Sequence, residues 1–118
     1  MLTVLIPKVF YSDIAVGIDL FVDGLGLRVI HQDDDLVVAE RDGVKVHLLQ
    51  DAEQAAKDRP AFSIETDDIE SVYADISARR PDLLHPNLGR ITRQPWGALE
   101  FALLDSTTVC VVLRQWTP

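Results

Sequence analysis

The chain has 118 residues, of which 47% are hydrophobic and 25% charged, a composition that is ordinary for a globular protein and a length that suits one domain. No apolar run approaches the ~20 residues of a membrane-spanning helix, and the formal net charge of −8, with no basic stretch beyond short pairs, argues against nucleic-acid binding. The single cysteine, Cys110, excludes a disulfide within the chain. Because the first residues also lack the basic start and cleavage site of a signal peptide, we expect a cytoplasmic protein.

The first half of the sequence is typical of a strand, a helix and three strands. Apolar residues recur at helical spacing from Ile14 to Leu25, and Gly24 and Gly26 end that pattern. An Asp42–Gly43 pair predicts a hairpin turn. The charged stretch 51–59 is expected to be a connector with at most one helical turn. The expected elements are a strand at 3–11, a helix at 14–25, and strands at 27–32, 36–41 and 44–50.

The second half repeats that order. Asp67 is expected to cap a helix, with Glu70 at the third helical position, and Pro81 disfavours helix at Arg80 and so ends it. The expected strands are 61–65, then roughly 83–94, 98–104 and 108–116. The repeat predicts two tandem βαβββ modules, over 3–50 and 60–117, within one domain of residues 1–118.

This order predicts an α+β fold in which the modules form a curved, mostly antiparallel eight-stranded sheet. Each module has one helix, which covers one face of its strands. The other face is left bare, as a groove suited to a ligand or a partner. A twofold homodimer is the simplest way to cover that face and complete the groove.

Two segments resemble the glyoxalase/bleomycin resistance protein/dioxygenase (vicinal oxygen chelate) superfamily. The first reads IPKVFYSDIAVGIDLFVDGLGL and is similar to the opening of these proteins. The second reads QPWGALEFALLDSTTVCVVL and is similar to the bleomycin-resistance branch, in its Pro-Trp-Gly, Glu-Phe and Asp-turn elements. One departure is that the usual Asp-Pro-x-Gly turn reads Asp105-Ser106-Thr107-Thr108 here. The resemblance implies the two-module fold and binding of an antibiotic without catalysis.

The resemblance also allows a test for a metal. Metal-dependent relatives carry His, Gln or Glu at four inward positions, because such metals need several N or O donors. Those positions here are Ile6, His47, Ala61 and Val112, and three of them have no donor atom. We therefore expect neither a metal nor another cofactor.

Strand alternation predicts which side chains face the groove. If Ile6 faces inward, so do the next two alternate positions of its strand, and the same logic applies around His47, Ala61 and Val112. The candidate ligand-binding residues are Trp96, His47, Phe10, Glu100, Glu65, Arg114, Lys8, Leu49 and Val112. His47 is either a polar residue on a half-exposed strand or a ligand hydrogen-bonding partner that titrates near neutral pH.

Trp96 provides the sharpest hypothesis. Its place between Pro95 and Gly97 predicts a turn, where a large ring can stack on a flat ligand. The resemblance agrees, since antibiotic-binding relatives stack planar groups on a tryptophan in this motif. The alternative is packing in a dimer interface, which is also the interpretation favoured for Trp116.

The run Asp33-Asp34-Asp35 is either a solvated turn or a groove edge that attracts a cation. Cys110 is interpreted as a packed thiol.

The leading hypothesis is therefore a binding protein that sequesters a planar aromatic, DNA-targeting natural product, bleomycin-like or a quinoline-bearing intercalating peptide, and so gives drug resistance. The first alternative is a glyoxalase- or epimerase-like enzyme with Glu100, Glu65 or His47 as general base. The second is a protein-interaction module.

Overall fold

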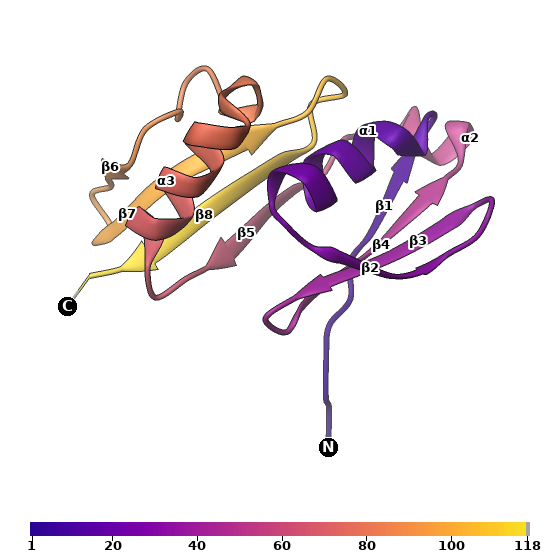
Figure 1. The fold of residues 1–118 in the computed structure, drawn as a ribbon, viewed down its shortest axis with the longest axis horizontal. Coiled ribbons are helices and arrows are strands. Elements are labelled where there is room, and N and C mark those ends of the chain that lie inside the picture. The colour runs from indigo at the N-terminus through magenta and orange to yellow at the C-terminus, as the bar shows by residue number, and fades with distance from the viewer. Residues whose placement is uncertain (118) are drawn as a thin grey trace. The chain divides into compact units, whose positions relative to one another are not determined.

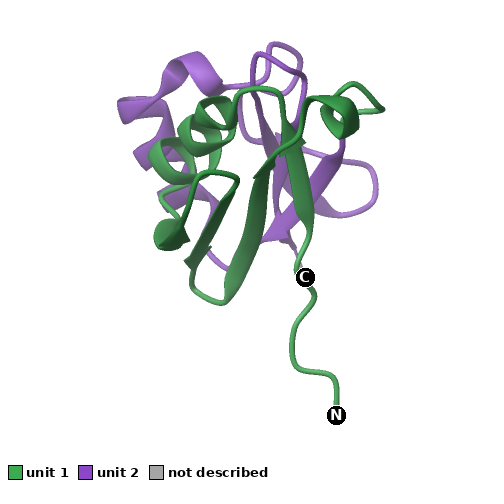
Figure 2. Cartoon of the chain, turned by 90° about the vertical axis from the view of Figure 1, so that its right-hand side faces the viewer, with its two compact units in different colours: residues 1–59 green, residues 60–118 purple. Residues whose placement is uncertain are grey.

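The computed structural model describes residues 1–117, which fall into two compact units, residues 1–59 (unit 1) and residues 60–117 (unit 2) (Figure 2). Both units have the same order of strand, helix and three strands (Figure 1). The predicted pair of βαβββ modules and the α+β class are thereby confirmed. The single-domain organisation of residues 1–118 stays a prediction.

In unit 1 the strands form a mixed four-stranded sheet in the order β1-β4-β3-β2. Strand β1 pairs with β4 in parallel, and the other neighbours are antiparallel. The short helix α1 packs against β1 and β4. The elements are β1 (Lys8–Tyr11), α1 (Ile14–Ile18), the π-helix η1 (Asp19–Gly24), β2 (Arg28–Gln32), β3 (Leu36–Arg41), β4 (Val44–Gln50) and α2 (Ala52–Ala55).

Unit 2 repeats this topology in the order β5-β8-β7-β6, again with one parallel pair, β5 with β8. Helix α3 packs against β7 and β8. The elements are β5 (Ala61–Glu65), α3 (Ile69–Arg79), the 3-10 helix η2 (Pro81–Leu83), β6 (Thr92–Arg93), β7 (Ala98–Leu104) and β8 (Cys110–Trp116).

Two predicted strands are shorter than expected. The first begins at Lys8 rather than residue 3, because Pro7 has no N–H and contributes only its carbonyl, which accepts from the His47 N–H. The strand expected at 83–94 is reduced to β6, because the prolines at 81 and 86 interrupt the ladder. Between these two prolines only isolated backbone contacts with β7 remain, such as the hydrogen bond from the His85 N–H to the Ala102 carbonyl at 2.8 Å.

Both helices differ from expectation in detail. The helix predicted over 14–25 widens at residue 19 into a π-helix, in which the Leu25 N–H donates to the Leu20 carbonyl five residues earlier. The wider turn lets Leu20 and Phe21 both reach the core. In unit 2 the N-cap of α3 is Asp68 rather than Asp67, because the Asp68 carboxylate accepts from the Ser71 N–H.

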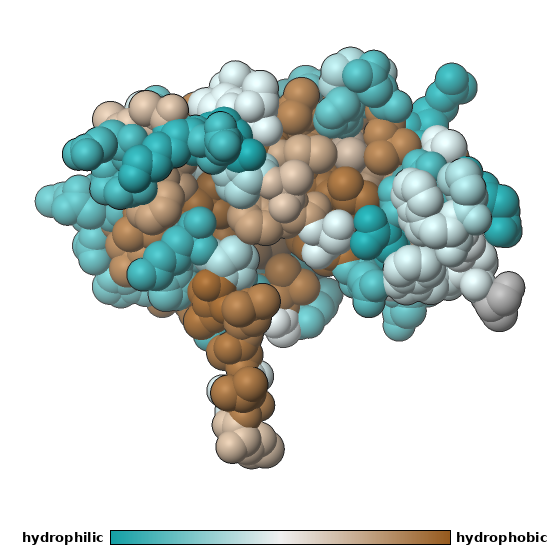
Figure 3. Space-filling model, turned by 180° about the vertical axis from the view of Figure 1, so that it is seen from behind, coloured by the Kyte–Doolittle hydropathy of each residue, from teal (hydrophilic) through white to brown (hydrophobic). Residues whose placement is uncertain are grey.

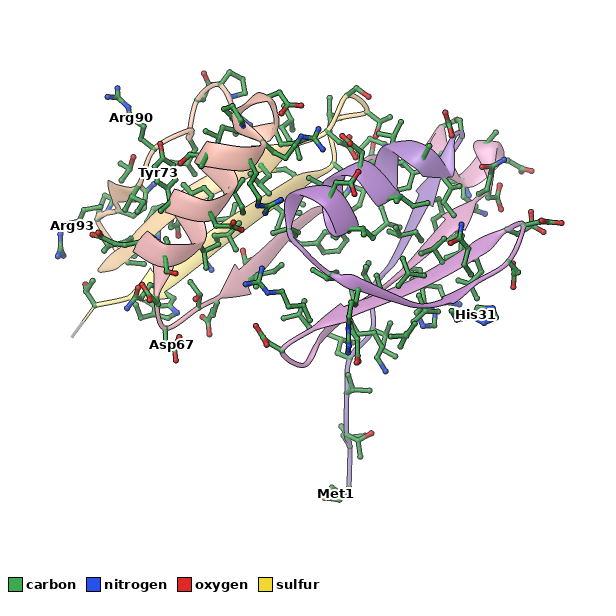
Figure 4. All side chains as sticks on the ribbon, in the orientation of Figure 1. Met1, His31, Asp67, Tyr73, Arg90 and Arg93 are labelled. Carbon is green, nitrogen blue, oxygen red and sulfur yellow. The ribbon has the colours of Figure 1, made fainter. Side chains whose placement is uncertain are left out.

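Each sheet buries its helix-facing side. In unit 1, Tyr11 is fully buried and lies against Gly17, where a Cβ would clash with the Tyr11 ring. In unit 2, the Phe101 ring packs edge-to-face with Tyr73 of α3 at 5.0 Å (Figure 4 labels Tyr73 on the helix). Alternation therefore points the intervening strand residues to the opposite face, where the candidate site lies.

The turn between β7 and β8 is held by Asp105, which is 5% exposed. Its Oδ1 accepts hydrogen bonds from the backbone N–H groups of Thr107 and Val109. Thr108 has a φ of 72°, in the left-handed region that a β-branched residue rarely adopts.

Replacing Thr108 with glycine is therefore expected to raise the free energy of unfolding by about 1 kcal/mol, because glycine adopts this φ without strain. Urea denaturation measures the change. Thr107→Gly is the matched control and is expected to destabilise, since it removes a hydroxyl that donates to Asp105 at 2.7 Å. A loss of stability in Thr108→Gly would contradict the strain argument.

Candidate ligand-binding site

In unit 1, four of the candidate residues lie on adjacent strands. Lys8 is opposite His47 and Phe10 is opposite Leu49 in the β1–β4 register. They alternate with the buried Val9, so they share the face away from α1. His47, Phe10 and Leu49 are half-buried and Lys8 is exposed, which makes this face partly apolar with a cation at its edge.

In unit 2, strand register places three charged candidates in one row across the sheet. Glu65 of β5 is opposite Arg114 of β8, and Arg114 is opposite Glu100 of β7. Phe101 on the next position of β7 packs against α3, so this row lies on the other face. Val112, two positions before Arg114 on β8, is half-buried on the same face.

Glu100 is the most buried charged residue of this row, with only 3% exposure. A buried carboxylate is costly unless it is paired and hydrogen-bonded. Here the Arg114 Nε donates to Glu100 Oε2 at 2.5 Å, and the Trp96 indole N–H donates to the same oxygen at 3.0 Å. The carboxylate thus fixes one guanidinium and one indole at once.

Trp96 lies in the turn between β6 and β7, as the sequence predicted. Gly97 adopts a φ of 90°, and its N–H donates to the Gln94 carbonyl at 3.0 Å. The Gly97 carbonyl accepts from the N–H and the hydroxyl of Thr117, which ties the turn to the end of β8. Trp96 is 56% exposed, so the turn and Glu100 together hold a large ring in contact with solvent.

Trp116 joins this arrangement from the end of β8. Its indole N–H donates to the Glu65 carboxylate, and the Arg114 guanidinium lies over its ring at 5.6 Å from the centroid. Trp116 is 51% exposed. We name the set the two-tryptophan cluster; its members are Glu65, Trp96, Glu100, Arg114 and Trp116.

The residues at the four metal positions do not fit a metal ion. Ile6, Ala61 and Val112 have no side-chain donor, and His47 alone is too few ligands. Among residues 1–117, no three His, Cys, Asp or Glu side chains gather in a way that suits metal binding.

The acidic run 33–35 forms a hydrogen-bonded turn. Asp33 Oδ1 accepts from the N–H groups of Asp35 and Leu36, and Oδ2 lies 3.0 Å from the His31 Nε2. The bond to His31, and then the bond from the Asp35 N–H, lower the pKa of Asp33. These contacts give Asp33 a role in the turn between β2 and β3, and Figure 4 labels His31 near that end of the two strands.

Cys110 is half-buried at the start of β8 and shares a face with Val112 and Arg114. Burial raises the pKa of its thiol, which lowers the thiolate fraction near neutral pH. We therefore expect iodoacetamide at about pH 8 to alkylate the native protein several-fold more slowly than the urea-unfolded chain. Mass spectrometry against time measures both rates. Equal rates would show that the thiol is not shielded.

Sequence reasoning kept Trp116 as an interface or packing residue, whereas the structure brings it to the candidate site. Strand alternation had already indicated the same face, since Trp116 follows Val112 and Arg114 at intervals of two on one strand.

No helix within residues 1–117 has the length and apolar character to cross a membrane.

Comparison with solved structures identifies the architecture. The chain superimposes on a bleomycin-binding protein in complex with bleomycin, with a TM-score of 0.78 and 16% identity over 98% of this chain and 100% of the other. A bleomycin-binding protein from bleomycin-producing Streptomyces verticillus, solved with copper(II)-bleomycin, matches with a TM-score of 0.73 and 21% identity, over 96% of this chain and 97% of the other. A glyoxalase/bleomycin resistance protein/dioxygenase from Alicyclobacillus acidocaldarius matches with a TM-score of 0.76 and 13% identity, over 98% of this chain and 92% of the other.

By sequence, no family model matches the chain. A search of curated proteins found no match either. The structural matches therefore determine the assignment, and they agree with the two sequence segments that resemble this superfamily. The chain has the fold of the glyoxalase/bleomycin resistance protein/dioxygenase superfamily.

Proposed function

We propose that this protein binds a planar aromatic, DNA-targeting natural product without a metal and sequesters it, so that the cell resists the drug. The observation that carries the proposal is the two-tryptophan cluster, in which Trp96 is half-exposed and yet held by Glu100. An exposed indole with a fixed orientation is suited to stack on a flat ligand, since little conformational entropy is lost on binding.

Two further observations support this function. Two of the matched structures are described as bleomycin-binding proteins, and both hold bleomycin or its copper complex. The hydrocarbon side chains at three of the four metal positions favour binding by shape and aromatic contact. Sequestration needs no bond to break, because a binder in excess of drug lowers the free drug by mass action. A Kd of about 1 μM corresponds to roughly 8 kcal/mol, which stacking plus burial of a drug-sized ligand can supply.

The enzyme alternative requires a carboxylate or imidazole that is available to remove a proton. Glu100 accepts from Arg114 and Trp96, and Glu65 accepts from Trp116, so both carboxylates already have partners. His47 is the remaining candidate base, half-buried next to Lys8. These contacts favour binding over catalysis at unit 2.

The test is a titration of purified protein with bleomycin and with a quinoline-bearing intercalating peptide, followed by tryptophan fluorescence and calorimetry. We expect saturable binding with a Kd of about 1 μM or below, unchanged by a chelator, and chromatographic recovery of the drug unaltered. Turnover of the drug, a requirement for a divalent ion, or no binding of either drug would reject the proposal.

We also propose that the protein acts as a homodimer. Four apolar residues before β1 are exposed, namely Met1, Leu2, Val4 and Leu5. Figure 3 shows the segment before β1 as a largely hydrophobic column, and Figure 4 labels Met1 at its tip. The edge strand β2 adds exposed Val29 and Ile30. Exposed apolar residues gathered in this way are typical of surfaces that a second chain covers.

Replacing Leu2 and Leu5 together with serine is therefore expected to weaken dimerisation at least tenfold, because burial of each leucine contributes about 1.5–3 kcal/mol. Analytical ultracentrifugation over a concentration series measures the dimer Kd. Thr3→Ser in the same segment is the control and should leave it unchanged. A wild-type protein that stays monomeric at all concentrations would refute the dimer.

A further inference from the structure

We infer that Trp116 and Arg114 form a second ligand-contact subsite beside Trp96, and that it selects a neutral planar ring carrying a carbonyl or carboxamide oxygen. This inference rests on the proposed function and specifies the chemistry of its ligand. Three features of the cluster carry it: an indole with an open surface, a guanidinium with unused donors, and a charge balance that disfavours anions.

Trp116 is held as a fixed and open surface. The Glu65 carboxylate takes its indole N–H, and the Arg114 guanidinium lies over the ring at 5.6 Å from the centroid. These two contacts set the orientation of the ring, yet 51% of the residue stays exposed. A flat ligand group can therefore stack on Trp116 without first ordering it.

Arg114 supplies hydrogen-bond donors next to that ring. Its Nε donates to Glu100 at 2.5 Å, whereas Nη1 and Nη2 have no hydrogen-bond partner among residues 1–117. The Arg114 side chain is 22% exposed. Neither amine is among the buried, unpartnered side-chain atoms of residues 1–117. The two amines can thus donate to an acceptor on a ligand that covers Trp116. The hydrogen bond to Glu100 already fixes the orientation of the guanidinium.

The charges around Arg114 decide which acceptor is favoured. One guanidinium stands among two carboxylates, Glu65 and Glu100, so the cluster has a formal charge of −1. An anionic ligand would meet that negative charge, whereas a neutral carbonyl oxygen takes the same N–H groups without repulsion. The subsite therefore fits an aromatic amide or ketone better than an aromatic carboxylate.

The experiment compares three small probes, quinoline-2-carboxamide, quinoline and quinoline-2-carboxylate, on full-length protein. In the wild type we expect the amide to bind about tenfold more tightly than either of the others, since a hydrogen bond from a charged donor strengthens binding by this order. The chain has two tryptophans, so Trp96→Phe leaves Trp116 as the single fluorescent reporter. The amide should quench Trp116 emission saturably in that variant.

Two variants remove the planar, charged fork of N–H donors that Arg114 presents. Arg114→Lys retains the charge beside Glu100 but loses the planar fork of donors. The double variant Glu100→Gln/Arg114→Gln avoids leaving a buried carboxylate unpaired. Both are expected to bind amide and quinoline with equal affinity. Arg93→Gln is the matched control, since Arg93 projects outward at the edge of unit 2 (Figure 4) and should keep the tenfold preference.

The outcomes separate this inference from the proposed function. If bleomycin binds but the amide preference survives both Arg114 variants, or if the Trp116 reporter is not quenched, the subsite is refuted and the proposed function stands. If Trp116 in the Trp96→Phe variant is shielded from acrylamide only at dimer-forming concentrations, a second copy covers it and the inference fails. If neither drug nor probe binds the wild type, the proposed function and the subsite fail together.

Discussion

Replacing Arg114 with leucine is expected to lower the free energy of unfolding by about 3–5 kcal/mol. The reason is Glu100, which is 3% exposed and relies on Arg114 at 2.5 Å for its charge partner. Without the guanidinium, only the Trp96 N–H is left to stabilise a carboxylate that is almost fully buried. Guanidinium chloride denaturation followed by circular dichroism measures the change.

Two controls separate this cost from a general effect of losing an arginine. Arg79→Leu breaks the ion pair with Asp75, in which both side chains are over 40% exposed, and should cost at most about 1 kcal/mol. The double variant Glu100→Leu/Arg114→Leu removes both charges and should recover most of the lost stability. Equal losses in the Arg114 and Arg79 variants would show that Glu100 is not dependent on its partner.

Replacing Trp96 with alanine is expected to weaken binding of the planar ligand about 30-fold, near 2 kcal/mol, as is common for a tryptophan at the centre of a binding surface. Because Trp96 is 56% exposed, its removal takes little apolar area out of the core, and the free energy of unfolding should change by less than about 1 kcal/mol. Calorimetric titration gives the affinity, and urea denaturation gives the stability.

Trp96→Phe is the matched control for the ring. It keeps an aromatic surface in the turn but removes the N–H that Glu100 accepts, so a loss of only a few-fold is expected. Wild-type affinity in Trp96→Ala would remove stacking on this residue from the mechanism. A loss in Trp96→Phe as large as in Trp96→Ala would instead assign the effect to the hydrogen bond with Glu100.

Local patterns in the sequence predicted much of the architecture. The alternation of Val9 and Tyr11 with Lys8 and Phe10 correctly indicated which residues face the helix, since side chains on a strand alternate strictly. The turn at Trp96 followed from its proline and glycine neighbours. The repeated order of elements predicted two modules, because the same periods recur in both halves.

Local patterns were less informative where a residue's partners lie far along the chain. The expected strand at 83–94 carried suitable residues, but prolines at 81 and 86 and the path beside β7 reduced it to β6. The cap of α3 moved from Asp67 to Asp68 because the Asp67 carbonyl accepts from the Gln115 side chain, 48 residues away. Boundaries depend on such contacts, which sequence periodicity does not encode.

The sequence by itself determined the module order, the faces of the strands and the absence of donors at three metal positions, because these follow from residue types and a period of two. Only the tertiary structure decided that Glu65, Glu100 and Arg114 form one row and that Trp116 belongs with them. Those contacts join residues 14 and 51 positions apart, through strand register and side-chain rotamers. The turn at Asp105 sets the register of β7 with β8, whereas the parallel register of β5 with β8 joins segments far apart in the chain, so no local stretch of sequence specifies it.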